Sequence, residues 1–471
     1  MAFKKKLHKF IPDDSVLIET QRTRRLVKSE PSDPVSIERE LRQLLSDKVS
    51  GTMVGIWLLI AEHLRLGTWE LLCGWCRRSG ETVEPRLALQ LVHEAALCSA
   101  GLRESRSLSQ RGFELANGLP FVATDRAIHN LLNNHSVAEA QALQVALGRI
   151  RRAGEHYRGR LLTVDPHPMK SFSKRQMRRH RHKENIPATK TSQTFFCLDV
   201  ETKQPVAFTV GSSARTATQA TPELLSIAED ILKPRPGKTR ILADTQHFSI
   251  QLFDHVVRNT PFDLLVPVPA QPTQIKRMQS IKQDRFTHRW AGLATAKVPY
   301  LFKDSATPLW LLVQRCGERP DNYQFEGFLS TSNCDELAAL IIQYPDRWHV
   351  EEFFKSNQAL GWNRAGTLNL NIRYGHMTMA LIAQAAIHQL RQRLGHPFST
   401  WDAAHLARNI FQGLDGDIRV VGDTIVVTFY NAPHAASLRQ QYQHLPQHLQ
   451  REGIDPRIPW LYNFKLDFRF K

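Results

Sequence analysis

The order of short apolar runs between residues 159 and 269 restricts the fold of this chain more than any other feature. Three runs of strand length come first: "GRLLTVD" (159–165), "TFFCLDV" (194–200) and "PVAFTVG" (205–211), the last two joined by the turn-like "ETKQ". They are followed by the helical "TPELLSIAEDIL", the strand-like "KTRILAD" (238–244), the helical "FSIQLFDHVVRN" and the strand-like "DLLVPVP" (263–269). This order, strand–hairpin–helix–strand–helix–strand, predicts a mixed α/β sheet.

The sequence around this core predicts an N-terminal domain, an insertion that divides the core in two, and a C-terminal appendage. Residues 1–155 read as an all-helical N-terminal domain, in which 123–132 and 136–152 form either a helix-turn-helix or a plain helical hairpin. The core itself occupies 156–269 and resumes at 336–412. Between these parts, 270–335 carry strand-like pieces and predict a β-rich insertion, and 413–471 form a C-terminal appendage.

The charge balance points to a polyanionic partner. The 471 residues include 62 Lys and Arg against 45 Asp and Glu, a formal net charge of +17. Such an excess favours DNA, because basic side chains neutralise phosphates and release counterions. Six scattered cysteines fit a reducing compartment, and no apolar run reaches the 18 residues of a membrane span. We therefore expect a cytoplasmic protein that does not engage a membrane.

Two of the predicted core strands end in a carboxylate, "RLLTVD" at Asp165 and "RILAD" at Asp244. Open α/β sheets place their active sites at the carboxyl ends of their strands, so these side chains are expected side by side. Two close carboxylates resist full ionisation unless a cation lies between them. Mg²⁺ takes carboxylate and phosphate oxygens, and Glu351 on a later helix would supply a third ligand.

Asp199 in "FFCLDVETKQPVAF" is the alternative to Asp165 as the first carboxylate, since it also follows an apolar run. The turn-like "ETKQP" comes directly after it. An Asp that opens a tight turn has a local reason to be there, because its side chain can bond to the backbone two residues on. We therefore favour Asp165.

The stretch "YPDRWHVEEFFKSNQALGW" (344–362) contains Glu351 and reads as a helix. At about 100° per residue, Tyr344, Arg347, Glu351 and Gln358 fall on one stripe, which Lys355 joins. A stripe of charged residues is either a solvated face or a functional one.

Taken together, "LLTVD", "ILADTQHF" and "YPDRWHVEEFFKSNQ" resemble the DDE transposases of bacterial insertion sequences. The similarity covers about residues 155–400 and is closest to the cut-and-paste group, whose final helix carries Tyr, Arg, Glu and Lys at fixed spacing. Tyr344, Arg347 and Glu351 match that spacing, whereas Gln358 stands where the family has Lys. The resemblance implies an RNase H-like core with a β-rich insertion, preceded by a helical domain that binds the ends of the element.

The resemblance also implies a mechanism. Asp165, Asp244 and Glu351 would hold two Mg²⁺ ions, for which Mn²⁺ could substitute, and these would promote in-line phosphodiester displacement. The substrates would be double-stranded terminal inverted repeats and target DNA, joined by at least a dimer. Tyr344 and Arg347 would contact phosphates near the scissile bond, Trp348 would either stack on an unpaired base or pack, and Lys355 would compensate for the Lys replaced by Gln358.

A basic run, "MKSFSKRQMRRHRHK" (169–183), follows the Asp165 strand. Its DNA-binding candidates are Lys174, Arg175, Arg178, Arg179, Arg181 and Lys183. Two other functions remain open from the sequence: an RNase H-like nuclease or resolvase, and a transposase-derived DNA-binding protein without activity.

Overall fold

The computed structural model describes residues 33–77, 82–98, 111–171, 179–180, 187–212, 214–361 and 369–471. These residues form two compact units. The first unit combines 1–136, 359–362 and 375–471, and the second combines 137–358 with 363–374. The chain is therefore grouped differently from the five consecutive parts expected from the sequence, since its N-terminal helices cluster with its C-terminal residues.

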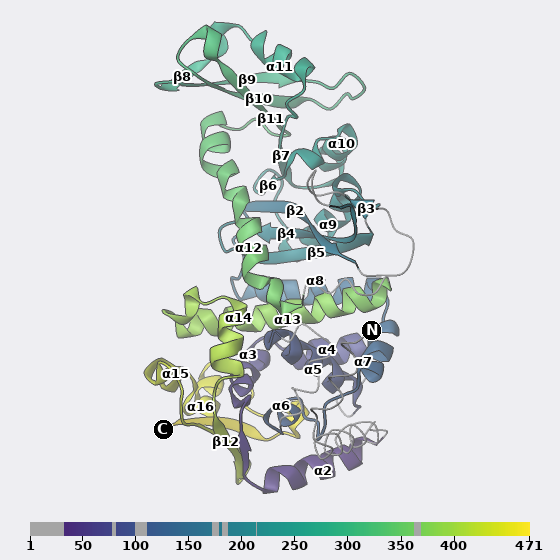
Figure 1. Ribbon diagram of the computed structural model, residues 1–471, viewed down its shortest axis with the longest axis vertical. Coiled ribbons are helices and arrows are strands. Elements are labelled where there is room, and N and C mark those ends of the chain that lie inside the picture. Colours follow the sequence, from purple (N-terminus) through teal and green to yellow (C-terminus); the bar gives the residue numbers. More distant parts are fainter. Residues whose placement is uncertain are drawn as a thin grey trace, which may run out of the picture. The chain divides into compact units, whose positions relative to one another are not determined.

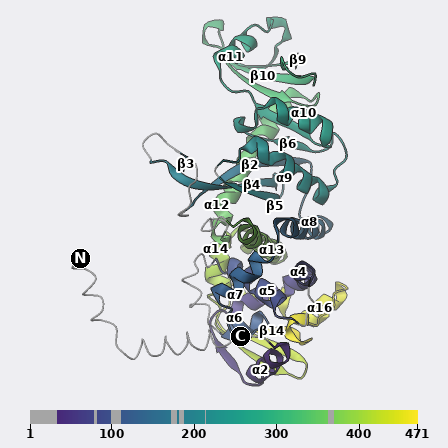
Figure 2. The same cartoon turned by 90° about the vertical axis from the view of Figure 1, so that its right-hand side faces the viewer.

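The second unit contains a mixed α/β sheet with the predicted order of elements, which confirms that fold class. Its core strands are β2 (Leu161–Lys170), β4 (Thr189–Asp199), β5 (Gln204–Ser212), β6 (Arg240–Leu242) and β7 (Asp263–Pro267). β2 pairs antiparallel with β4 and parallel with β6, β4 pairs antiparallel with β5, and β6 pairs parallel with β7. In Figure 2, β2 and β4 extend together toward the short strand β3 (Arg179–His180), which pairs with β4.

The helices between the core strands and just before them are α8 (Val137–Ala153), α9 (Ala217–Leu232) and α10 (Ile250–Asn259). In α9 the apolar side chains Leu224, Ala228 and Ile231 recur at helical spacing and are fully buried in the same core as Leu162 of β2. α9 begins with a capping box, in which Thr216 and Gln219 each bond to the backbone of the other. The helix is thus fixed at its start by capping and along its length by burial.

The segment from residue 338 to residue 360 changes its helical pitch three times. It runs as a π-helix (Ala338–Gln343), a 3₁₀-helix (Tyr344–Trp348), the α-helix α12 (His349–Asn357) and a 3₁₀ turn (Gln358–Leu360). Pro345 has no N–H to donate to the preceding turn, which accounts for the change at this point. The expected single α-helix is therefore wrong outside α12. In Figure 1, α12 lies alongside β2, β4 and β5.

The β-rich insertion continues the core sheet instead of forming a separate layer. It comprises α11 (Pro272–Gln279), β8 (Thr287–Trp290), β9 (Leu293–Tyr300), β10 (Leu309–Cys316) and β11 (Gln324–Ser330). β11 pairs antiparallel with β7, so the order from the core outward is β7-β11-β10-β9-β8. β8 and α11 are elements that the sequence did not predict.

The first unit packs short helices with a second sheet. Its helices are α2 (Pro34–Ser46), α3 (Leu58–Arg65), α4 (Thr68–Cys76), α5 (Glu84–Ala96), α6 (Arg111–Ala116), α7 (Asp125–Asn133), α13 (Leu370–Leu394, from Gly375 on), α14 (Ala403–Leu406), α15 (Ala435–Tyr442) and α16 (Leu445–Arg451). The sheet has the order β1-β12-β13-β14, with strands Val49–Gly51, Gly416–Val421, Thr424–Phe429 and Lys465–Phe470. β1 makes the N-terminal part less than all-helical, and it pairs with β12.

The two helices considered as a helix-turn-helix, α7 and α8, fall in different compact units. Over the described ranges, no helix has both the length and the hydropathy required of a membrane span.

Candidate active site

Asp165 and Asp244 stand at equivalent distances from a residue pair that joins the parallel strands β2 and β6. Thr163 of β2 is paired with Leu242, the last residue of β6; Asp165 comes two residues later within β2, and Asp244 comes two residues after Leu242, just beyond β6. Because side chains alternate along extended backbone, which Asp244 keeps beyond the end of β6, a step of two places both carboxylates on one face. The two predicted carboxylates are therefore brought together, as neighbours across adjacent strands.

Asp165 does not end its strand, so that expectation is wrong. β2 continues to Lys170 along β4, with Asp165 opposite Phe196. Pro166 and Pro168 lie beyond the last residue that pairs with β6, and their spacing of two directs both nitrogens to the same side. On that open side a missing N–H costs no ladder hydrogen bond, so the strand tolerates both prolines.

Packing of α12 on the sheet places Glu351. Phe354 stacks on the ring of His167 of β2 at 4.3 Å and lies 5.3 Å from the ring of Phe196 of β4. Val350 and Phe353 are buried on the same face of the helix. Glu351 is three residues before Phe354, and its side chain is 35% exposed. Packing of the apolar face of α12 on β2 and β4 thus holds Glu351 near β2, the strand that carries Asp165.

Arg347 links two of the three predicted carboxylates. Its Nη1 lies 3.5 Å from Oδ1 of Asp165, and its Nη2 lies 4.0 Å from Oε1 of Glu351. Both distances are longer than a strong charge-assisted hydrogen bond, so these are ion-pair contacts. A cation thus already lies between Asp165 and Glu351, and it comes from the protein itself.

Tyr344 belongs to the same cluster through the geometry of its short helix. Residues three apart eclipse in a 3₁₀-helix, which brings Tyr344 over Arg347. Its ring packs edge-on against Phe328 at 4.7 Å, and its hydroxyl reaches the carbonyl of Ala243, just before Asp244, at 3.4 Å. Burial raises the pKa of Tyr344 to about 12. Tyr344 therefore supports the site from within as a neutral phenol.

Asp244 is held by its own turn. It caps the 3₁₀-helix Thr245–His247, accepting from the N–H of Gln246 at 3.0 Å. Oδ1 also contacts Nδ1 of His247 at 2.7 Å, and the His247 ring is buried. The sequence analysis assigned no role to His247; its spacing of three from Asp244 is the signal that could have pointed to this contact.

Asp165 has the most perturbed acidity of the cluster. Burial, and then repulsion by Asp244, raise the pKa of Asp165 from its ordinary 3.8 to about 7; Glu351 adds to the rise, and Arg347 opposes it. The side chain is 16% exposed. At neutral pH, Asp165 is therefore fully ionised only if more positive charge lies beside it than Arg347 provides.

This acidity predicts a pH dependence of stability in the absence of divalent ions. Between about pH 4 and pH 7 the folded protein holds a proton on Asp165 that the unfolded chain has released. The free energy of unfolding should therefore fall as the pH rises through this window and level off above it. Urea titrations in EDTA should show this fall in the wild type and a smaller one in Asp165→Asn. Identical pH profiles for the two proteins would contradict the assignment.

Asp199, the alternative first carboxylate, is a fully buried structural residue. Its Oδ2 accepts from the N–H groups of Arg158 at 2.8 Å and Gly159 at 2.6 Å. Its Oδ1 accepts from the N–H of Thr202 at 2.9 Å and from the Thr202 hydroxyl at 3.0 Å. Four donors on one carboxylate leave it no free direction toward a substrate.

The remaining predicted residues divide into those that the structure describes and those outside it. Trp348 is 52% exposed, and Nζ of Lys355 lies 5.6 Å from its ring centre. Gln358 is half-buried and follows α12 directly; Arg179 lies exposed on β3. Lys174, Arg175, Arg178, Arg181 and Lys183 lie outside the described residues.

The three side chains offer carboxylate oxygens, which are the ligands that a hard divalent cation prefers. A cation would also relieve the repulsion between Asp165 and Asp244, which together with burial raises the pKa of Asp165. In this arrangement the oxygens do not converge. Within the described ranges, no group of three or more His, Cys, Asp or Glu side chains is close enough to hold one ion. Binding of one ion by all three carboxylates would therefore require their side chains to move closer together.

The chain matches no protein-family model and no curated protein. Among solved structures it is similar to a piggyBac transposase, determined by cryo-electron microscopy in a synaptic complex with hairpin DNA. The sequence identity is 13%, the match covers 78% of this chain and 82% of the other, and the TM-score is 0.40. The function proposed next rests on the arrangement of Asp165, Asp244 and Glu351.

Proposed function

We propose that this chain is a DDE-type DNA transposase, which binds the ends of its own insertion sequence and cleaves and joins DNA there. The observation that carries the proposal is the pairing of β2 with β6, which sets Asp165 within β2 beside Asp244 just after β6, with Glu351 linked to Asp165 through Arg347. The Tyr344–Arg347–Glu351 spacing and the net charge of +17 support it.

The three carboxylates would hold Mg²⁺, with Mn²⁺ as a substitute, and the bound metal would activate a hydroxyl nucleophile and stabilise the leaving oxygen. Asp165 would be a metal ligand in its ionised form, and the positive charge of the metal would favour that form over the protonated one. Asp244 is kept in place by Gln246 and His247. Arg347, once released from its carboxylates, would be free to bind a phosphate of the DNA.

The activity is tested with DNA duplexes that carry the terminal inverted repeats flanking the gene. The purified chain with Mg²⁺ should nick these ends and join the freed 3′-hydroxyl to a second DNA molecule. Mg²⁺-dependent cutting without preference for the repeats would indicate a nuclease or resolvase instead. Binding to the repeats without any cutting would indicate a DNA-binding derivative.

Trp348 is proposed to stack on a base of the bound DNA, because its ring is exposed beside Arg347 and carries Lys355 over one face. Stacking on an aromatic ring contributes about 1–3 kcal/mol per base. Trp348→Ala should therefore weaken binding to a repeat duplex by about tenfold, measured by fluorescence anisotropy, whereas Trp348→Phe should keep most of the affinity. Equal affinity for wild type and Trp348→Ala would remove Trp348 from the DNA interface.

A further inference from the structure

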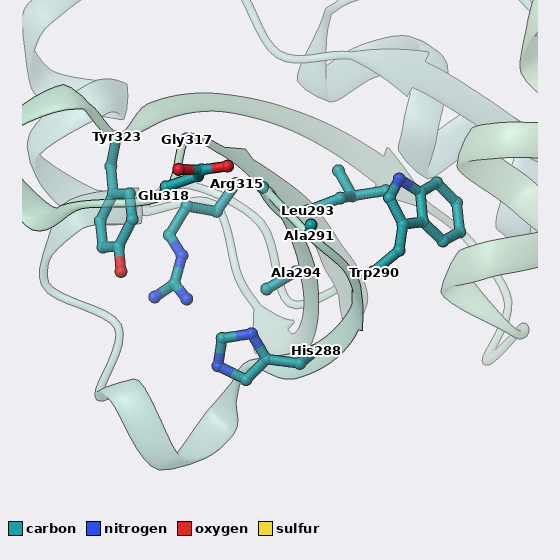
Figure 3. Close-up of a pocket in the computed structure, with 10 residues that line it drawn as sticks. His288, Trp290, Ala291, Leu293, Ala294, Arg315, Gly317, Glu318 and Tyr323 are labelled. Atoms are coloured by element: carbon teal, nitrogen blue, oxygen red, sulfur yellow. The ribbon is translucent and has the colours of Figure 1, made fainter.

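The β-rich insertion contains a pocket of about 350 Å³ over strands β8, β9 and β10. Figure 3 shows the side chains around it, with the guanidinium of Arg315 lying between the rings of Tyr323 and His288 and with Trp290 at the far side. The carboxylate of Glu318 lies on the other side of the Arg315 backbone from this guanidinium. This size is in the range of small-molecule sites.

Strand register explains why the surface is hollow here. His288 of β8 pairs with Ala294 of β9, and Ala294 pairs in turn with Arg315 of β10. Residues directly opposite across a sheet project from the same face, so these three side chains form one row. A methyl group between two long polar side chains leaves a gap between them, with a cation on one side and an imidazole on the other.

Arg315 is an unusual residue to find beneath this gap. It is only 3% exposed, and its guanidinium lies 4.1 Å from the ring centre of Tyr323 and 4.5 Å from that of Phe286. Its Nη1 donates to Oε1 of Gln283, while its Nε has no hydrogen-bond partner among the described residues. In the part of the chain that the structure describes, Arg315 forms no ion pair with a carboxylate, since the acceptor of its Nη1 is the neutral amide of Gln283.

A buried guanidinium without a counter-charge is costly, since desolvation of an ion costs several kcal/mol unless a partner compensates it. The two aromatic faces offset part of this cost through cation–π attraction. They also hold the guanidinium plane fixed, which is how an arginine is prepared to bind a flat or branched anion through several N–H groups.

We propose that this pocket binds a phosphate group carried by a nucleotide, with Arg315 as the charged partner and His288 as a hydrogen-bond donor from the opposite wall. A phosphate fills only part of the volume, and the exposed ring of Trp290 suits the attached sugar or base. Glu318, exposed at the rim, would oppose the anion and limit its affinity. The inference is independent of the proposed transposition chemistry, because its test reads binding alone.

The test is isothermal titration of the full-length chain, without divalent ions, with deoxythymidine monophosphate, inorganic phosphate and thymidine. We expect saturable binding of the monophosphate and weaker or no binding of thymidine. Arg315→Gln should weaken binding of the monophosphate at least about tenfold, since it removes a charge-assisted contact. Glu318→Gln should strengthen it a few-fold, because a like charge is removed.

Two further variants control this test. Arg319→Gln removes the same charge from an exposed residue of the neighbouring turn and should leave the affinity unchanged. His288 is exposed, so His288→Ala should fold even if Arg315→Gln does not. It should weaken binding of the monophosphate, because it removes the hydrogen-bond donor of the opposite wall. Equal losses in Arg315→Gln and Arg319→Gln, an unchanged affinity in His288→Ala, or equal binding of thymidine and its monophosphate would overturn the proposal.

A fourth ligand distinguishes a phosphate of the DNA backbone from that of a free nucleotide or a strand end. It is a short single-stranded oligodeoxynucleotide without terminal phosphates. Binding of this oligonucleotide that is lost in His288→Ala assigns the pocket to a backbone phosphodiester. Binding of the monophosphate alone assigns it to a free nucleotide or a strand end. Either result supports a phosphate site, whereas no saturable binding of any phosphate-bearing ligand rules it out.

Discussion

Glu351→Gln is expected to lower the rate of DNA cleavage by on the order of 10³-fold or more while the protein still binds the repeats. Glutamine keeps the shape of the side chain but removes the charge that a bound divalent cation needs. Affinity for DNA should stay the same or rise slightly, because a negative charge near the phosphates is removed. Cleavage of a labelled repeat duplex and gel-shift binding measure the two quantities separately.

The adjacent Glu352 provides the matched control. It lies on the same helix, but its carboxylate points to Nζ of Lys203 and Nδ1 of His349, both at 2.9 Å. Glu352→Gln should therefore keep cleavage within a few-fold of the wild type, since an exposed pair contributes little. Asp165→Asn should behave like Glu351→Gln. If Glu352→Gln were inactive and Glu351→Gln active, Glu351 would not be the third carboxylate.

Asp199→Asn is expected to reduce the free energy of unfolding by about 3 kcal/mol or more. The buried carboxylate accepts four hydrogen bonds, and the amide group of asparagine would turn one of its two acceptors into a donor facing other donors. Urea denaturation followed by circular dichroism measures the change. The folded fraction of this variant should keep its activity per molecule.

Asp304→Asn is a suitable control, because Asp304 is exposed and should tolerate the change within about 0.5 kcal/mol. The decisive comparison is between Asp199→Asn and Asp165→Asn. A stable but inactive Asp199→Asn together with an active Asp165→Asn would make Asp199 the catalytic residue and Asp165 a structural one.

The core sheet was predictable because its strands are continuous apolar runs with clear breaks. The extent of β2 was not, because Pro166 and Pro168 look like the end of a strand unless its pairing is known. The pitch changes around Pro345 were hidden for a similar reason: "AALIIQYPDRW" has a helical pattern throughout, and only the packed structure shows where the missing N–H is accommodated.

Within the site, Asp165 and Asp244 were predictable from their places at the ends of apolar runs, and Glu351 from its helix. The contact of Arg347 with Asp165 joins residues 182 positions apart and could not be read from spacing. Asp199 was separable from Asp165 only by its turn, and its four donors come from two segments of the chain. The pocket over Ala294 depends on the pairing of three strands, which no local pattern reveals.

The pairing of β11 with β7 also bears on how this chain avoids aggregation. A core sheet that stopped at β7 would present a row of unpaired N–H and C=O groups to other molecules. β11 covers that row, and the sheet then ends at β8, a strand of four residues with an irregular register. The insertion therefore covers the edge of the core sheet. A variant that lacks residues 270–335 would expose β7 as an edge strand and would be prone to aggregate through it.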